Sequence, residues 1–204
     1  MTPDYWQQAK AHLSRRDKVL KRFIKAYPAD ADLRTRGDAF QTLARSIVGQ
    51  QISVKAAQAI WGRFATAAGK MTPANVMALP VEVMRACGLS GQKALYLKDL
   101  AAHFDTRTVN PRRWGRMADE AIIEDLVRVK GIGRWSVEMF LIFHLMRPDV
   151  LPVGDLGLRR AMERAYNDGN ALTPAEMREI ASAWAPWSTV ATWYLWRSLD
   201  PVSF

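Results

Sequence analysis

Apolar residues recur at steps of three and four along most of the chain, the spacing that places them on one face of an α-helix. The clearest run has its apolar positions at Phe40, Leu43, Ala44, Ile47 and Val48. A second run follows Ser53 and would bury Ala56, Ala59, Ile60 and Phe64. No long alternation of apolar and polar residues indicates a strand. We therefore expect an all-α fold with about ten helices.

Helix start and stop signals support this fold class. Thr72-Pro73 and Thr173-Pro174 each predict an N-cap followed by proline at the first helical position. Gly88 predicts the end of a helix, and Ser90 predicts the N-cap of the next one.

Composition narrows the classes of function. Lys and Arg number 29 against 20 acidic residues, so the formal net charge is +9 and a polyanionic partner is favoured. Cys87 is the single cysteine, which excludes an internal disulfide and any cluster held by four thiolates. The three histidines lack metal-ligand spacing. No apolar run reaches roughly 18 residues and no signal peptide is visible, so we expect a cytoplasmic protein without a membrane partner, nucleoid-associated if bacterial.

The strongest local signal is a predicted turn between two helices. Two glycines around one apolar residue permit a tight turn whose amides face a phosphate, and the next helix N-terminus favours an anion. An ordinary helix connection closed by a glycine is the alternative. The pattern matches a helix-hairpin-helix motif, which contacts the DNA backbone without reading sequence. The predicted contact residues are Lys130, Gly131, Ile132, Gly133 and Arg134.

This hairpin and the downstream loop Leu151-Pro-Val-Gly-Asp155 resemble the helix-hairpin-helix DNA glycosylase superfamily. Segments 46–53, 88–94 and 193–201 extend the resemblance over nearly the whole chain. Within the superfamily the chain is most similar to the alkylpurine branch, the 3-methyladenine DNA glycosylase II proteins.

The resemblance implies one glycosylase fold over residues 1–204, built from two helical lobes with a cleft between them. One lobe would span about residues 40–130, and the other about residues 1–39 plus 131–204. It also implies an enzyme that acts in base excision repair on double-stranded DNA with a damaged base, and a monomer is the default expectation. The enzyme would flip out alkylated purines such as 3-methyladenine and hydrolyse the N-glycosidic bond.

Asp155 is the candidate catalytic carboxylate. It follows Trp135 by 20 residues, the separation that the resemblance leads us to expect. Glycosidic cleavage builds positive charge on the sugar, which a fixed carboxylate stabilises while it orients a water. Asp155 also reads as a simple N-cap of the next helix, and both roles are compatible. No partner acid is evident, and an alkylated purine needs none because its ring is already cationic.

Trp135 separates two mechanisms. The bifunctional branch of the superfamily carries a lysine nucleophile directly after the hairpin arginine, whereas this chain has Trp135 there. The resemblance therefore implies a monofunctional hydrolase. Trp135, Trp196 and Met139 would line the base pocket, where an indole face attracts a cationic base by roughly 0.5–2 kcal/mol.

Gln50 and Gln51 lie between two predicted helices. Their amides either cap backbone groups or, as the resemblance implies for this turn, fill the gap left by the flipped base. Gln51 is the preferred wedge. The resemblance further implies a Na⁺ or K⁺ ion on the carbonyls of Val127, Val129 and Ile132, with no other cofactor required.

The chain departs from the family pattern at two positions. Ser188 stands where relatives commonly have Arg before the last helix, and Gly154 stands where a second acid is frequent. Two alternatives stay open: a non-catalytic helix-hairpin-helix module that only binds DNA, and a glycosylase of the same fold for uracil or hypoxanthine.

Overall fold

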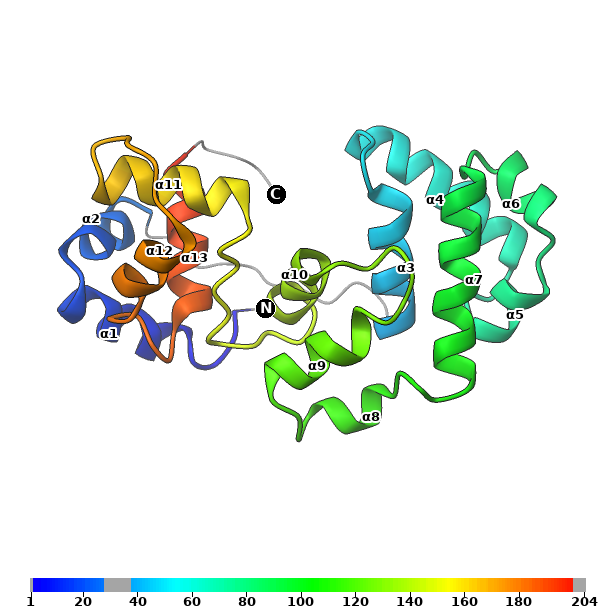
Figure 1. The fold of residues 1–204 in the computed structure, drawn as a ribbon, viewed down its shortest axis with the longest axis horizontal. Coiled ribbons are helices and arrows are strands. Elements are labelled where there is room, and N and C mark those ends of the chain that lie inside the picture. The colour runs from blue at the N-terminus through cyan, green and yellow to red at the C-terminus, as the bar shows by residue number, and fades with distance from the viewer. Residues whose placement is uncertain (1, 28–37, 200–204) are drawn as a thin grey trace. The chain divides into compact units, whose positions relative to one another are not determined.

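Every regular element is an α-helix in the computed structural model, which describes residues 2–27 and 38–199. The helices, shown in Figure 1, are α1 Trp6–Arg16, α2 Lys18–Ala26, α3 Ala39–Gly49, α4 Val54–Ala68, α5 Pro73–Ala78, α6 Val81–Ala86, α7 Gly91–Asp105, α8 Pro111–Trp114, α9 Asp119–Leu126, α10 Arg134–Phe143, α11 Leu156–Tyr166, α12 Pro174–Ala181 and α13 Ser188–Arg197. The all-α prediction is confirmed. More helices form in the described residues than the ten or so expected, and α5, α6 and α8 among them have only 6, 6 and 4 residues. No helix of the described segments is long and apolar enough to cross a membrane.

The chain divides into two compact units. We call Thr35–Phe140 the hairpin unit, and Met1–Arg34 with Leu141–Phe204 the terminal unit. Helix α10 runs across the second boundary, which lies ten residues beyond the boundary expected near residue 130.

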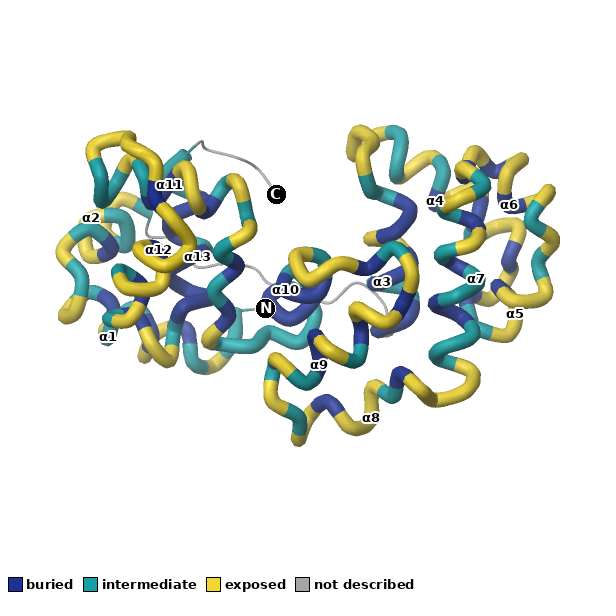
Figure 2. The backbone as a smooth tube through the Cα atoms, viewed as in Figure 1, coloured by how far each residue is buried: buried dark blue, intermediate teal, exposed yellow. Residues whose placement is uncertain are grey.

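The hairpin unit is organised around α7. This helix packs against α3, α5 and α6, and α3 also packs against α4. Figure 2 shows buried positions along α3 and α7. The face of α3 buries the predicted residues Phe40, Leu43, Ala44, Ile47 and Val48.

The predicted buried face of α4 is confirmed at Phe64 and wrong at Ala59. Its buried residues are Trp61, Phe64 and Ala68, whereas Ala59 is exposed and Ala56 is half-buried. The aromatic side chains remove more apolar surface from water than the alanines do, so they set the rotation of the helix.

The N-caps are placed as the sequence predicts. Each cap side chain accepts a backbone N–H, and α12 starts with a complete capping box. Gly88 follows α6 with a φ of 97°, which a residue with a Cβ rarely adopts. The confirmed caps are Thr72, Ser90, Asp155 and Thr173, and Ser53, where the sequence placed a helix start, caps α4 as well.

One core joins the two ends of the chain in the terminal unit. Helices α1 and α2 pack with α13, and α11 packs with α13. The largest side chains of this core, Trp6, Trp184 and Tyr194, are fully buried. The core therefore fixes α11 and α13, which carry Asp155 and Trp196.

Asp17 connects three parts of this unit through one carboxylate. Its Oδ1 caps α2 by accepting the amides of Val19 at 2.8 Å and Leu20 at 3.0 Å. Its Oδ2 accepts the hydroxyl of Tyr166 at 2.7 Å and the indole N–H of Trp184 at 2.9 Å. Four donors thus depend on a single side chain.

We expect Asp17→Asn to lower the free energy of unfolding by about 2–3 kcal/mol. In Asn one carboxylate oxygen becomes an NH₂ group, so two of the four donors lose their acceptor and face another donor. Urea denaturation measures the loss. Asp38→Asn is the matched control, since Asp38 caps α3 at an exposed position through the Gln41 amide at 2.9 Å and Asn caps equally well. Equal losses in the two variants would contradict the role of Asp17.

Tyr166 should make the protein less stable in alkali. Burial, and then the Asp17 charge, raise the pKa of this phenol above its ordinary value near 10. Above that value the unfolded chain releases the proton while the folded chain keeps it, so stability falls as pH rises, by up to about 1.4 kcal/mol per pH unit. Tyr166→Phe should flatten the fall between pH 10 and 11, measured by urea denaturation at each pH. Burial also raises the pKa of Tyr5, to about 12, so part of the slope remains. An unchanged slope in Tyr166→Phe would contradict this assignment.

Candidate active site and nucleic-acid interface

Asp155 is held at the N-terminus of α11 by two N–H donors. Its Oδ1 accepts the backbone amide of Leu158 at 2.6 Å and the indole Nε1–H of Trp196 at 2.8 Å. One donor belongs to its own helix and the other to α13, 41 residues further along the chain. The carboxylate is therefore fixed in orientation before any substrate binds.

Trp196 is itself held in place. Its indole is 9% exposed and stacks on Phe143, with ring centroids 5.9 Å apart and planes 14° apart. The predicted pocket residue thus has one face covered by Phe143 and its N–H committed to Asp155.

Gly157 leaves the space in which this contact forms. A Cβ at that position would lie 3.1 Å from Oδ1 of Asp155 and 3.3 Å from Nε1 of Trp196. A Cβ at Gly154, in contrast, would meet no atom within 4 Å. Close packing around the carboxylate therefore requires glycine at only one of these two positions.

The N-terminus of α13 is supported despite the departure at Ser188. The Ser188 amide and hydroxyl both donate to Oδ1 of Asp149, at 3.0 Å and 2.5 Å. The Thr189 hydroxyl donates to the Arg147 carbonyl at 2.6 Å and accepts the Val150 amide at 3.0 Å. Two hydroxyls therefore hold the start of α13 to the segment before it.

The predicted turn lies between α9 and α10 in the hairpin unit. Gly131 has a φ of 83°, and a Cβ there would lie 2.1 Å from the Tyr96 ring. Ile132 is 5% exposed, so it is the buried anchor of the turn. Within residues 2–27 and 38–199, the N–H groups of Gly131 and Gly133 make no hydrogen bond. Two amides are thus available for a phosphate oxygen.

The cations that flank the turn are both paired. Arg134 forms a bidentate pair with Glu120, with both distances 2.7 Å, and a further bond to Glu138 at 3.1 Å. The hydrogen bond to Glu120 raises the pKa of Arg134, and the same contact lowers the pKa of Glu120. The Lys130 amide donates to Asp99 at 2.8 Å, and its ammonium lies 3.9 Å from the same carboxylate. The turn therefore combines two amides without a hydrogen-bond partner among the described residues with two cations that lie within ion-pair distance of carboxylates.

The two glutamines of the α3–α4 turn differ in their contacts. Gln50 donates its side-chain N–H to the Gly131 carbonyl at 2.7 Å, so it acts as the backbone cap that was the alternative to a wedge. Gln51 is exposed, has a φ of 56°, and its side chain makes no hydrogen bond to any described residue. Lys93 of α7 donates to the carbonyls of Val48 and Gln50, both at 2.8 Å.

The predicted residues fall into two groups. The terminal unit brings Asp155 and Trp196 together. The hairpin unit holds Trp135, which is 50% exposed, and the half-buried Met139 one turn further along α10. Sequence reasoning missed the roles of Lys93, Tyr96, Asp99, Phe143 and Gly157; only the three-residue spacing of the first three, on one predicted helix, could have drawn attention to them.

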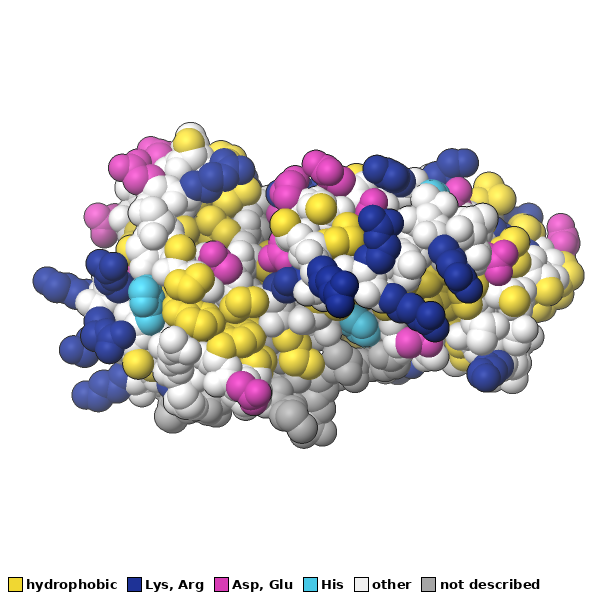
Figure 3. Space-filling model, turned by 90° about the horizontal axis from the view of Figure 1, so that it is seen from below, with side chains coloured by type: hydrophobic (Ala, Val, Ile, Leu, Met, Phe, Trp, Pro, Cys, Tyr) yellow, Lys and Arg dark blue, Asp and Glu magenta, His cyan; other side chains and the backbone are white. Residues whose placement is uncertain are grey.

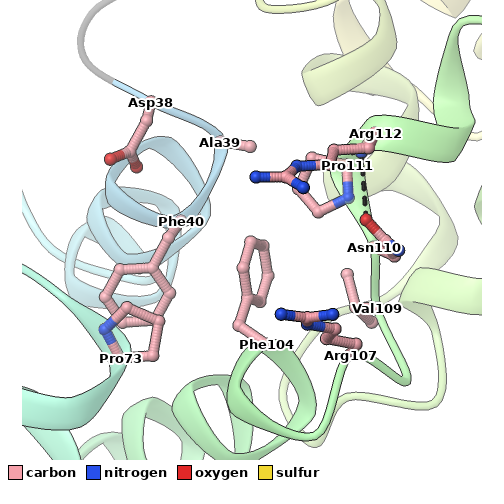
Figure 4. Close-up of a pocket in the computed structure, with 10 residues that line it drawn as sticks. All are labelled: Asp38, Ala39, Phe40, Pro73, Phe104, Arg107, Val109, Asn110, Pro111 and Arg112. Atoms are coloured by element: carbon pink, nitrogen blue, oxygen red, sulfur yellow. Dashed lines mark hydrogen bonds between the residues drawn. The ribbon is translucent and has the colours of Figure 1, made fainter.

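A cavity of about 530 Å³ in the hairpin unit lies at the N-terminal end of α3, the end opposite Gln51. The rings of Phe40 and Phe104 line it together with Arg107 and Arg112 (Figure 4). None of the predicted site residues lines this cavity. On the face drawn in Figure 3, Lys and Arg side chains are spread over both units, in keeping with the net charge of +9.

Comparison with known proteins identifies the family. Residues 44–186 match the model of the HhH-GPD superfamily base excision DNA repair protein. DNA-3-methyladenine glycosylase 1 of Schizosaccharomyces pombe is 34% identical over 198 residues, which is 94% of this chain and 86% of that protein. A DNA-3-methyladenine glycosidase structure from Bacillus halodurans has a TM-score of 0.85 at 35% identity, covering 93% of this chain and 87% of that one. The S. pombe 3-methyladenine DNA glycosylase Mag1 in complex with abasic DNA has a TM-score of 0.79 at 33% identity, covering 97% and 100%. The resemblance read from the hairpin and the Asp155 loop is confirmed, and the chain belongs to the HhH-GPD superfamily of base excision DNA repair proteins.

Proposed function

We propose that the protein is a monofunctional DNA glycosylase that flips an alkylated purine such as 3-methyladenine out of duplex DNA and hydrolyses its N-glycosidic bond. The observation that carries the proposal is the single carboxylate of Asp155, fixed by the Leu158 amide and the Trp196 indole. Relatives named as 3-methyladenine glycosylases at 34% and 35% identity support it.

The chemistry follows from the charges of the reacting groups. As the base leaves, positive charge grows on the sugar, and the Asp155 carboxylate stabilises that charge and orients the attacking water. A cationic alkylated base leaves with the bond electrons and becomes neutral, so it needs no strong acid. Position 135 carries an indole instead of an amine, so no covalent imine with the sugar forms there and the backbone stays intact.

Base recognition rests on aromatic faces. Trp135 is half-exposed and Met139 lies one turn away, so both can contact a flipped base. An indole face attracts a cationic ring more strongly than a neutral one, which favours alkylated purines over normal bases. Trp196, whose N–H is bound to Asp155, contributes mainly by holding the carboxylate.

The hairpin holds the DNA backbone through the amides of Gly131 and Gly133. A Na⁺ or K⁺ ion would be bound by carbonyls at the end of α9. The Val129 carbonyl accepts one amide, that of Ile132 at 3.1 Å, and keeps a second lone pair for the ion. Hard monovalent ions prefer such neutral oxygens, so Val127, Val129 and Ile132 fit the ion, which would add positive charge beside the bound phosphate. We expect the enzyme to act as a monomer.

Asp155→Asn should lower single-turnover release of 3-methyladenine from methylated duplex DNA by at least about 100-fold, because the charge that stabilises the sugar is lost. The fold should survive, since Asn is as good an N-cap as Asp. Chromatography of released bases gives the rate, and binding to abasic-site DNA should persist.

Other outcomes of this experiment point elsewhere. Undiminished release in Asp155→Asn would remove Asp155 from the chemistry. No release by the unaltered protein from methylated, uracil or hypoxanthine DNA, despite tight binding to abasic DNA, would indicate a binding-only module. Release of uracil or hypoxanthine alone would change the assigned substrate from alkylated purines to that base.

Gly157→Ala should lower the rate of base release by roughly 10-fold or more, because the added methyl displaces the Trp196 contact that orients Asp155. Gly154→Ala is the matched control and should change the rate by less than about twofold, since its methyl meets no neighbour. Single-turnover rates of the two variants decide the matter. Equal rates would show that orientation by Trp196 is unimportant.

A further inference from the structure

The turn that carries Gln51 has a backbone that needs support. Helix α3 ends at Gly49, and Gln51 lies in the left-handed region with a φ of 56°, which is unfavourable for a residue with a Cβ. The last carbonyls of a helix also lack intrahelical partners. A turn of this kind keeps one shape only if neighbouring groups hold it.

Lys93 supplies that support from a different helix. Its ammonium donates to the carbonyls of Val48 and Gln50, 45 and 43 residues away in the chain, both at 2.8 Å. An ammonium on a long stem provides several donors from one point, which suits two converging carbonyls. The neighbouring residues Ala94 and Leu97 are fully buried, so the stem rises from a packed part of α7.

The same helix holds the hairpin. The Tyr96 ring fills the space beside Gly131, and Asp99 accepts the Lys130 amide. Gln50 connects the α3–α4 turn to the hairpin by donating its side-chain N–H to the Gly131 carbonyl at 2.7 Å. Residues 93, 96 and 99 thus hold both DNA-facing turns from successive turns of α7.

We propose that Lys93 is a positioning residue for base extrusion: its ammonium fixes the Gln50–Gln51 turn relative to the phosphate-binding amides of the hairpin. With the phosphate bound at Gly131 and Gly133, Gln51 then meets the base stack at a set position. This inference rests on the proposed glycosylase function and on Gln51 as the wedge. Lys93 acts through the turn and contacts neither the base nor the reacting sugar.

The test compares Lys93→Met with Lys98→Met. Methionine keeps the aliphatic stem and removes the ammonium. Lys98 is the matched control because it lies on the same helix and also donates to a carbonyl, that of Met77, away from both DNA-facing turns. The thermal unfolding temperature of each variant shows whether the fold is retained.

The first readout is wedge insertion. The probe is duplex DNA with 2-aminopurine opposite a stable abasic analogue, whose fluorescence changes when a side chain enters the gap. Lys93→Met should lose most of the change at saturating protein, while Lys98→Met keeps it. This measurement needs no base release, so it tests Lys93 even if the glycosylase assignment fails.

The second readout is single-turnover release of one alkylated purine in two contexts. With the lesion paired, Lys93→Met should be slower by about 10-fold, because unpairing and gap filling limit the rate. With the lesion opposite the abasic analogue, the deficit should shrink to less than about twofold, since little unpairing remains. Lys93→Arg should recover most of the paired rate, because a guanidinium also reaches two carbonyls.

Coupling to Gln51 decides the mechanism. In a Gln51→Ala background, the additional change Lys93→Met should lower the rate of base release only slightly, because the effects of residues that act as one unit are not additive. Full additivity, an equal loss in both lesion contexts, or an unchanged fluorescence response in Lys93→Met would each overturn the proposal.

Discussion

The unpaired backbone groups at helix ends are the constraint on which the proposed site depends. Each helix leaves several N–H groups at its start and several carbonyls at its end without intrahelical partners. Three such ends involve the residues of interest. They are the start of α11, which Asp155 caps, the end of α3, whose carbonyls Lys93 of α7 binds, and the start of α10 after Gly133. A side chain satisfies the first two. The third keeps N–H groups that, in the proposed function, a DNA phosphate would satisfy.

Two carboxylates of the terminal unit make the same kind of contact but differ in role. Asp17 and Asp155 each cap a helix and each accept an indole N–H, from Trp184 and Trp196. Asp17 accepts four hydrogen bonds, two on each carboxylate oxygen, and these bonds join the two ends of the chain in one core. At Asp155 the Leu158 and Trp196 donors both bind Oδ1. Two donors on Oδ1 fix the plane of the carboxylate and therefore the position of Oδ2. A carboxylate that is to face a sugar needs such a fixed orientation.

The local part of this architecture could be predicted from the sequence, and the long-range part could not. N-caps such as Ser53 and Ser90, the hairpin and Asp155 depend on neighbours within four residues, so short patterns reveal them. The Lys93 and Gln50 bonds span 43 to 81 residues and depend on how helices pack. The sequence predicted the buried Phe64 of α4 but not Trp61, for the same reason: alanines at a helical period fit either face, and which face is buried depends on the helices packed against it. The pairing of Arg134 with Glu120 likewise joins two helices and could not be predicted, whereas its bond to Glu138 has the local i,i+4 spacing.

That pairing changes how the hairpin attracts DNA. Arg134 is bound to two carboxylates, while the largely exposed Lys130 ammonium lies 3.9 Å from Asp99. The net charge of +9 still produces a long-range field that draws a polyanion toward the protein, and that contribution weakens with salt. The amides of Gly131 and Gly133 act only at contact and carry no net charge, so their contribution depends on geometry and little on ionic strength. In the proposed function, long-range attraction and positioning at contact are therefore supplied by different groups. In the proposed function, the amides of Gly131 and Gly133, with the cation proposed beside them, would position one phosphate and so set where the Gln51 turn meets the DNA.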